Sequence, residues 1–308
     1  MVTTRLLLSG GRGLIGSALS RYLASQAIAT DLQYLSRAAD VDGALTVRWD
    51  PVTGYIDADG LEGFDAVIHL AGETIASRWS KARKTRIRDS RVGGTALLAQ
   101  ALAKCARPPK TLICASAIGY YGDRGDEIVD EESAAGAGFL AEVVRDWEGA
   151  AAAALAAGIR VVHLRFGLVL SSSGGALTSM LLPFKLGLGG PLGSGRQYVS
   201  WVTLGDVVAV IDHVLAHDTI AGAVNVTTSA AVTQAEFART LGRTLHRPSI
   251  LPLPGWAVRL LLGEMGEELL LASTRVHPGQ LLASGYTFQQ QDLSAALTHL
   301  LTVPRESI

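Results

Sequence analysis

The chain has few cysteines, almost no net charge and no long apolar run, and each of these absences argues against a class of protein. It has only two cysteines in 308 residues, Cys105 and Cys114, which fits a reducing compartment and gives no metal-binding motif. Its formal net charge of -1 argues against nucleic-acid binding as its main function. It shows no secretory signal and no run of 18 apolar residues, so we expect a cytoplasmic protein without a membrane partner.

A glycine-rich turn lies close to the first residues. The segment Ser9–Gly16 follows a short apolar run and opens a stretch with apolar residues at helical spacing. In such a strand–turn–helix unit the glycines let the backbone approach a pyrophosphate, which lies at the positive end of the helix. A structural turn without a ligand is the alternative. The contacts predicted for a dinucleotide here are Gly10, Gly11, Arg12, Gly13, Leu14 and Ile15.

The residues after the second predicted strand bear on which dinucleotide is bound. Ser36 lies 20 residues beyond Gly16, where NAD-binding folds carry an acidic residue for the ribose 2′-hydroxyl. Here Ser36 is followed by Arg37, a hydroxyl and a guanidinium that suit a 2′-phosphate. Arg12 adds a second positive charge, although Arg37 as a solvated loop residue is the alternative. We therefore predict NADP(H) rather than NAD(H).

The apolar run over residues 65–72 reads as a buried parallel strand that ends in small residues. Leu70, Ala71 and Gly72 at its carboxyl end leave room for the cofactor. His69 lies among apolar neighbours, and we interpret it as a core residue. A long helix follows over residues 77–104, with a strongly basic first half.

The rest of the chain continues the alternation and then departs from it. Strands are expected at residues 46–50, 111–116 and 160–164, and a helix at 139–157, with residue 158 as its glycine cap. Beyond residue 170 the pattern weakens, and residues 171–175 read as a flexible loop. We predict an α/β fold with a sheet domain and a smaller C-terminal lobe. The sheet domain takes residues 1–170 and 201–226, and the lobe takes residues 171–200 and 227–308.

Several motifs together resemble the extended short-chain dehydrogenase/reductase superfamily. They are the glycine turn, residues 67–72, Ser116 at a strand end, and the segment Trp201–Val207. Residues 71–75, 89–91 and 182–195 are similar to one atypical branch, the "nucleoside-diphosphate-sugar epimerase family protein" branch, sometimes described as SulA-like. The resemblance covers nearly the whole chain. It implies a Rossmann-type doubly wound parallel sheet that binds NADP(H), with a C-terminal substrate lobe.

The resemblance also implies further cofactor contacts. Extended members often carry Asn-Val-x-Gly-Thr on the long helix, with the Asn near the cofactor. This chain has Arg91 in the Asn position, which brings a charge compatible with phosphate. Arg165 ends the sixth predicted strand beside the nicotinamide half of the site, and a plain surface role is the alternative for both arginines. The remaining predicted contacts at these strand ends are Ala115, Ser116 and Phe166.

The chain departs from the superfamily at the catalytic residues. These enzymes use a Ser, a Tyr and a Lys four residues after the Tyr, and the Lys tunes the phenol that passes the proton. Ser116 takes the Ser position, but the Tyr and Lys positions hold Phe139 and Val143. The candidates left for proton transfer are Ser116, Tyr120 and Tyr121. Packing of the loop is the alternative role for the two tyrosines.

Three functions stay open at this point. In the first, the protein is an NADP(H)-dependent oxidoreductase or epimerase that acts on a carbonyl or sugar-nucleotide-like compound. In the second, it catalyses a reaction that needs only the placement of a hydride. In the third, it binds the cofactor without turnover, as a regulatory or scaffold protein. The substrate pocket is expected between the carboxyl edge of the sheet and the lobe. The expected walls include Glu73, Trp79, Tyr120, Leu182, Phe184, Lys185 and Trp201. A homodimer through residues 86–104 and 139–157 is possible.

Overall fold

The computed structural model describes residues 3–26, 30–37 and 45–302. Its centre is a sheet of eight strands, all parallel except the last, which is antiparallel to β3. In spatial order these strands are β12 (Gly222–Val226), β8 (Arg160–Phe166), β6 (Thr111–Ala117), β5 (Ala66–His69), β1 (Thr4–Ser9), β2 (Thr30–Ser36), β3 (Thr46–Asp50) and β4 (Tyr55–Ile56). This is the predicted doubly wound parallel sheet.

The order of the strands reverses between β1 and β5. The chain first runs outward through β2 and β3, and then crosses to β5 on the other side of β1. Ser9, the last residue of β1, is in register with His69, the last residue of β5. In open parallel sheets ligands bind at the carboxyl ends of the strands where the order reverses. The topology therefore places the glycine turn at the binding edge.

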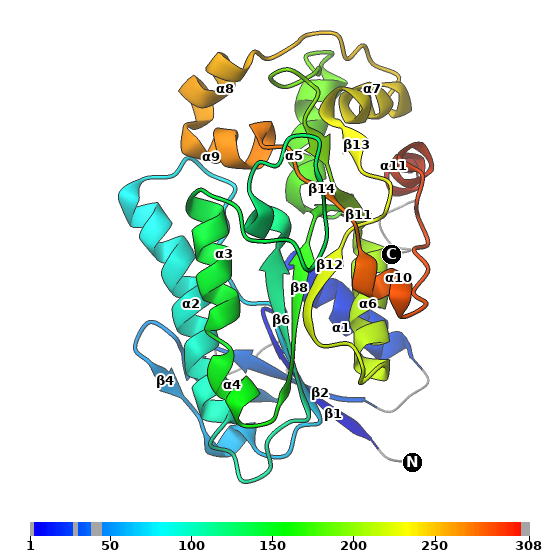
Figure 1. Cartoon of the computed structure of the whole chain (residues 1–308). Helices are drawn as coiled ribbons and strands as arrows, with labels where there is room; N and C mark the ends of the chain where they lie inside the picture. The colour runs from blue at the N-terminus through cyan, green and yellow to red at the C-terminus, as the bar shows by residue number, and fades with distance from the viewer. Residues whose placement is uncertain (1–2, 27–29, 38–44, 303–308) are drawn as a thin grey trace.

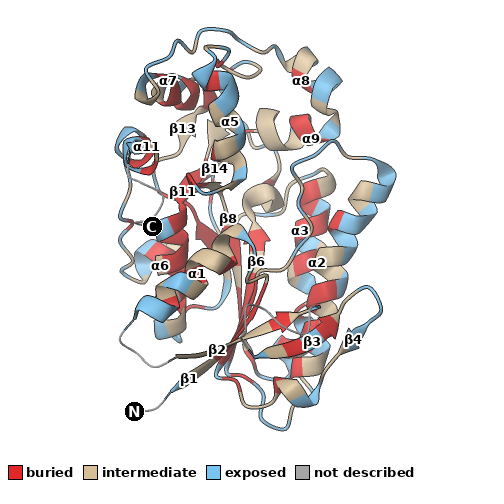
Figure 2. Cartoon of the chain, turned by 180° about the vertical axis from the view of Figure 1, so that it is seen from behind, coloured by how far each residue is buried: buried red, intermediate tan, exposed pale blue. Residues whose placement is uncertain are grey.

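Helices cover both faces of the sheet, as Figure 1 shows. On one face lie α1 (Leu14–Ser25) and α6 (Leu204–Ala216), which share a core with β1, β5 and β8. The other face is covered by α2 (Lys81–Leu102), α3 (Phe139–Gly149) and α4 (Ala152–Ala156). Figure 2 shows the strands between these layers as largely buried. The sheet needs this double cover because its strands are apolar on both faces.

A smaller group of helices lies beyond the carboxyl edge of the sheet, at the top of Figure 1. It has its own core, in which Phe184, Trp201 and Phe237 are buried. Its helices are α5 (Gly175–Lys185), α7 (Gln234–Thr244), α8 (Gly255–Leu262), α9 (Glu264–Gly266), the π-helical turn η3 (Glu267–Leu271) and α11 (Leu293–Thr302).

Short elements join the two parts of the molecule. They are η2 (Ile118–Tyr121), α10 (Gly279–Ala283) and the paired strands β7 (Ile128–Val129) with β14 (Arg275–Val276), β9 (Leu168–Leu170) with β11 (Trp201–Thr203), and β10 (Tyr198–Val199) with β13 (Val232–Thr233). The short helix η1 (Asp59–Leu61) belongs to the sheet domain, where Leu61 is buried in its core. Leu281 and Phe288 pack in the core beneath α1 and α6, although the sequence analysis places them in the lobe. The predicted domain boundaries stay a prediction.

Two helices differ from the sequence-based expectation. The helix expected over residues 139–157 breaks at Ala150 and Ala151 into α3 and α4. The segment expected as a flexible loop, residues 171–175, ends at the first residue of α5, a helix that carries Pro183 in its interior.

In the described part of the chain, no helix is long and apolar enough to cross a bilayer. The possible homodimer stays a prediction.

Candidate cofactor and substrate site

The glycine turn is packed so tightly that side chains are excluded at three of its positions. Gly10 has φ +74°, and a Cβ there would lie 2.7 Å from the carbonyl carbon of Leu70. A Cβ at Gly11 would lie 2.5 Å from the ring of Tyr34, and one at Gly16 would lie 2.3 Å from the carbonyl oxygen of Gly10. Glycine is therefore required here by the close approach of β1, β5 and α1.

The first turn of α1 is prepared for an anion. Gly13 is the residue before the helix, so no side chain caps the first N–H groups, and the first turn carries no acidic residue. The turn itself is closed by the Gly13 N–H, which donates to the Gly10 carbonyl at 2.9 Å. The free N–H groups and the positive end of the helix dipole together suit a pyrophosphate.

The predicted determinants of the 2′-phosphate lie along the same edge. Ser36 ends β2, whose residue Leu35 is in register with Ser9 of β1. Arg37 follows directly and is exposed, and Arg12 is exposed in the turn. Ser36 and Arg37 therefore follow the strand next to β1, at the edge of the sheet that carries the glycine turn.

The end of β1 is joined to the end of β5 by a buried serine. The Ser9 hydroxyl oxygen accepts the N–H groups of Leu70 and Ala71 at 3.1 and 3.3 Å, and it shares a hydrogen bond with Nδ1 of His69 at 2.6 Å. His69 is fully buried, and burial lowers its pKa to about 4. Within the described residues its Nε2 has no hydrogen-bond partner. His69 thus lies in the core, as predicted, and helps to hold the strand ends that face the turn.

Arg91 lies next to the strand end at Gly72. A Cβ on Gly72 would be 3.6 Å from Cζ of Arg91. Arg91 donates to the carbonyl oxygens of Glu73 and Ile87 and lies over the ring of Trp147, and burial lowers its pKa to about 10. No carboxylate of the described residues lies within 4.0 Å of it. A largely buried cation without an acidic partner suits a phosphate.

Ser116 and Arg165 meet at a third residue, Glu148 on α3. The Ser116 hydroxyl donates to Oε1 of Glu148 at 2.6 Å, and Arg165 donates to both carboxylate oxygens at 2.8 Å. Burial opposes the charge on Glu148, but the bonds from Arg165 outweigh it and lower the pKa of this carboxyl. Arg165 is only 3% exposed. The side chains of Ser116 and Arg165, two predicted site residues, are therefore both hydrogen-bonded within the protein.

The two candidate tyrosines differ in their surroundings. Tyr121 is fully buried, and its hydroxyl donates to Asn225 at 2.7 Å and accepts from Arg165 at 2.9 Å. Burial raises the pKa of Tyr121 to about 12. Tyr120 is half-buried, with the Arg165 guanidinium 3.6 Å from its ring centroid. In the described chain the Tyr120 hydroxyl makes no hydrogen bond, so it is the candidate with a free polar group.

Phe139 and Val143, which are predicted to take the superfamily's Tyr and Lys positions, both lie in the first turns of α3. Phe139 is the first residue of α3, and its ring contacts Trp79 and lies 4.3 Å from Nζ of Lys84. Val143, one turn further, is 1% exposed. Neither position offers a proton.

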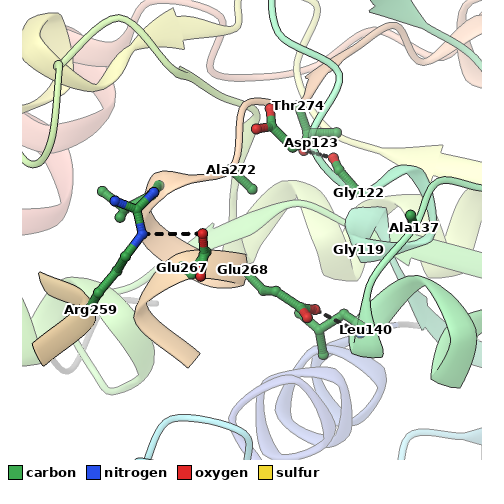
Figure 3. A pocket seen from close by; sticks show the side chains of 11 residues that line it. Gly119, Gly122, Asp123, Ala137, Leu140, Arg259, Glu267, Glu268, Ala272 and Thr274 are labelled. Atoms are coloured by element: carbon green, nitrogen blue, oxygen red, sulfur yellow. Dashed lines mark hydrogen bonds and ion pairs between the residues drawn. The ribbon is translucent and has the colours of Figure 1, made fainter. Parts of the chain in front are cut away.

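A pocket of about 200 Å³ opens beside the start of α3 (Figure 3). One wall comes from η2 and the residues around it, and the other comes from α8, η3 and the segment after η3. Its lining residues are Gly119, Gly122, Asp123, Ala137, Leu140, Arg259, Glu267, Glu268, Leu271, Ala272 and Thr274. None of the expected wall residues, Tyr120 included, is among the described residues that line this pocket. Trp201 and Phe184 are instead buried in the core of the lobe.

Two residues of this region were missed by the sequence analysis. Glu268 accepts the N–H groups of Phe139 and Leu140 at 2.9 and 2.8 Å, so it caps α3 from a distant part of the chain. No local signal identifies such a cap. Glu148 lies four residues after the buried Val144, and an acid on the buried face of a helix indicates a buried partner.

Comparisons with known proteins agree with this geometry. The family described as "NAD dependent epimerase/dehydratase family" matches residues 6–227, and "Domain of unknown function (DUF1731)" matches residues 253–300. An epimerase family protein of Mycobacterium bovis is 43% identical, with 99% of this chain and 100% of the relative covered. The human epimerase family protein SDR39U1 is 36% identical over 96% of this chain and 99% of the relative.

A solved structure shows the same arrangement. The crystal structure of human SDR39U1 with NADPH superimposes with a TM-score of 0.87 and 34% identity, covering 97% of this chain and 99% of that chain. A nucleoside-diphosphate sugar epimerase from Corynebacterium glutamicum gives a TM-score of 0.79 at 34% identity, with 97% of this chain and 58% of that chain covered. From its sequence, fold and glycine turn, the chain belongs to the NAD dependent epimerase/dehydratase family.

Proposed function

We propose that the protein binds NADP(H) at the carboxyl edge of its sheet. The observation that carries this proposal is the glycine turn, which is closed against β5 and opens the uncapped first turn of α1. The pyrophosphate would lie at this helix end, with Arg91 as an additional cation beside Gly72. The NADPH in the human relative's structure supports the choice of ligand.

The preference for the 2′-phosphate rests on Ser36 and Arg37. Arg37 is exposed at the end of β2, one strand from the glycine turn. An arginine donates two parallel hydrogen bonds to a phosphate, which a ribose 2′-hydroxyl does not match. Arg12 in the turn contributes a second charge of the same sign.

Replacing Arg37 with aspartate is expected to weaken NADPH binding about ten- to a hundredfold and to leave NADH binding nearly unchanged. The loss corresponds to one charge-assisted phosphate contact, roughly 1.5–3 kcal/mol. Titration calorimetry with both cofactors measures it. Arg21→Asp is the matched control, because Arg21 is equally exposed but lies on α1, away from the strand ends. An equal loss for both cofactors in Arg37→Asp would contradict the 2′-phosphate assignment.

As the reaction, we propose NADP(H)-dependent reduction, oxidation or epimerisation of a small carbonyl or sugar-nucleotide-like compound in the pocket beside η2. Tyr120 supports this proposal, since its hydroxyl makes no hydrogen bond in the described structure and it lies in η2 next to the lining residue Gly119, although Tyr120 does not itself line the pocket. The cofactor, when bound, supplies or accepts hydride. Tyr120 would pass the proton, which Phe139 cannot do.

A second candidate function is cofactor binding without turnover, as a regulatory or scaffold protein. The observation that favours it is that Ser116 and Tyr121 are committed to partners inside the protein. The residue predicted at the Lys position, Val143, is buried and cannot tune a phenol, which also supports this candidate.

A panel of carbonyl compounds separates the two candidates. If the protein is an oxidoreductase, NADPH oxidation is expected with at least one of them, and Tyr120→Phe should lower the rate about a hundredfold while NADPH still binds. Ser116→Ala should change the rate far less, because its hydroxyl donates to Glu148. NADPH binding without any turnover across the panel favours the second candidate.

A further inference from the structure

The charged groups that line the pocket beside the start of α3 are mostly acidic, and the rest of its lining is largely glycine, alanine and leucine. Asp123, Glu267 and Glu268 contribute three carboxylates to its wall (Figure 3). The only basic residue of the lining is Arg259, whose Nε donates to Oε1 of Glu267 at 3.1 Å. The single positive charge is therefore already neutralised by one of the three acids.

The other two carboxylates are fixed in place by the backbone. Glu268 accepts the two first N–H groups of α3, and Oδ1 of Asp123 accepts the N–H groups of Gly125 and Ser273 at 3.2 and 3.0 Å. Neither is paired with an arginine or lysine in the described part of the chain. These acids stay where they are when a ligand enters, and their unused lone pairs accept hydrogen bonds from it.

The volume of the pocket and the charge of its lining both disfavour a large anionic ligand. Its volume of about 200 Å³ is below the ~300–1,000 Å³ of sites that enclose drug-sized ligands. A nucleoside diphosphate linked to a sugar is larger than such ligands and brings two negative charges. The pocket offers those charges no free cation, and like charges at short range repel.

We infer that this pocket takes a small uncharged or cationic compound rich in hydroxyl or amino groups, and that it rejects sugar nucleotides and carboxylates. The inference rests on the proposed function, since it names the substrate class of the same site. It narrows the reaction to a small polyol, amino alcohol or uncharged carbonyl compound. Lys185, a cation among the expected walls of the substrate pocket, does not line it.

The test compares probes that share one skeleton and differ in charge. They are 4-oxopentanoate, 4-oxopentanamide and 4-amino-2-butanone, which carry a carboxylate, a carboxamide and an ammonium on the same oxobutyl group, together with UDP-glucose as the sugar nucleotide. Binding to the NADPH-loaded protein is measured by ligand-observed NMR, which needs no turnover. The amide and the amine are expected to bind at least about tenfold more tightly than the carboxylate and UDP-glucose.

Two variants locate this preference in the pocket. Glu267→Gln removes one lining carboxylate and leaves the charge of Arg259 without an anionic partner, so it should raise binding of 4-oxopentanoate several-fold. Glu264→Gln is the matched control, because Glu264 is on the same segment but pairs with Lys84 and does not line the pocket. It should leave the order of affinities unchanged.

The outcomes separate this inference from the proposed function. Equal or tighter binding of the anions, or no binding by any probe, overturns the inference while NADPH binding stands. Preferential binding of the amide and amine without any NADPH oxidation supports the inference and counts against the oxidoreductase.

Discussion

Replacing Gly16 with alanine is expected to weaken NADPH binding by at least about a hundredfold, a loss of about 2.7 kcal/mol. A Cβ at this position would lie 2.3 Å from the Gly10 carbonyl oxygen and 2.8 Å from Cα of Gly11. All of these atoms are backbone, so only a shift of α1 away from the turn relieves the clash. The shift moves the N–H groups that would hold the pyrophosphate. Titration calorimetry measures the loss, and circular dichroism shows whether the fold is kept.

Gly93→Ala is the matched control for this prediction. Gly93 also lies in a helix, but a Cβ there meets no atom within 4 Å. The same substitution should therefore leave NADPH affinity unchanged and stabilise α2 by up to about 1 kcal/mol. NADPH affinity in Gly16→Ala equal to that of the wild type would contradict the role given to the turn.

Replacing Glu148 with alanine is expected to lower the free energy of unfolding by about 3–5 kcal/mol. The substitution leaves Arg165 as a buried cation and removes the acceptor of the Ser116 hydroxyl. It affects two strands at once, because Ser116 and Arg165 lie in register on β6 and β8. Urea denaturation followed by tryptophan fluorescence measures the change.

The neighbouring Asp146 supplies a control on the same helix. It pairs with Arg88 and Arg145, both of which are more exposed than Arg165. Surface pairs of this kind contribute about 0–1 kcal/mol, so Asp146→Ala should cost less than 1 kcal/mol. Similar losses for the two variants would show that the Glu148 network does not stabilise the sheet as described.

The sequence identifies the parts of the site that depend on local geometry. The glycine turn, the small residues after β5 and the Ser36–Arg37 pair are contiguous segments whose backbone requirements are readable from residue types. The parallel sheet follows from the alternation of apolar strands and helices. The prediction of NADP(H) agrees with the NADPH in the human relative's structure.

The remainder depends on contacts between distant residues. Ser116 is a reasonable catalytic candidate in sequence, but its hydroxyl points to Glu148, 32 positions away. Two of the three carboxylates of the pocket, Glu267 and Glu268, come from η3, whose residues carry no motif. The serines and glycines of residues 171–175 predict a loop, although α5 begins at Gly175. The internal Pro183 also disfavours the prediction of a helix here.

The predicted cofactor contacts at Gly10–Ile15, Ser36, Arg37 and Leu70–Gly72 gather at one edge and stay predictions as contacts. Arg91 lies at this edge as well, beside Gly72. Ala115 and Phe166 lie near the carboxyl ends of β6 and β8, close to the same edge. Arg165 is different, because its guanidinium is occupied by Glu148 and Tyr121.

The most direct measurement of the central claim is a calorimetric titration of the wild-type protein with NADPH and with NADH. The glycine turn, α1 and Arg37 together predict one site per chain, with NADPH bound at least about tenfold more tightly than NADH. Failure to bind NADPH, or equal affinity for the two cofactors, would contradict this account.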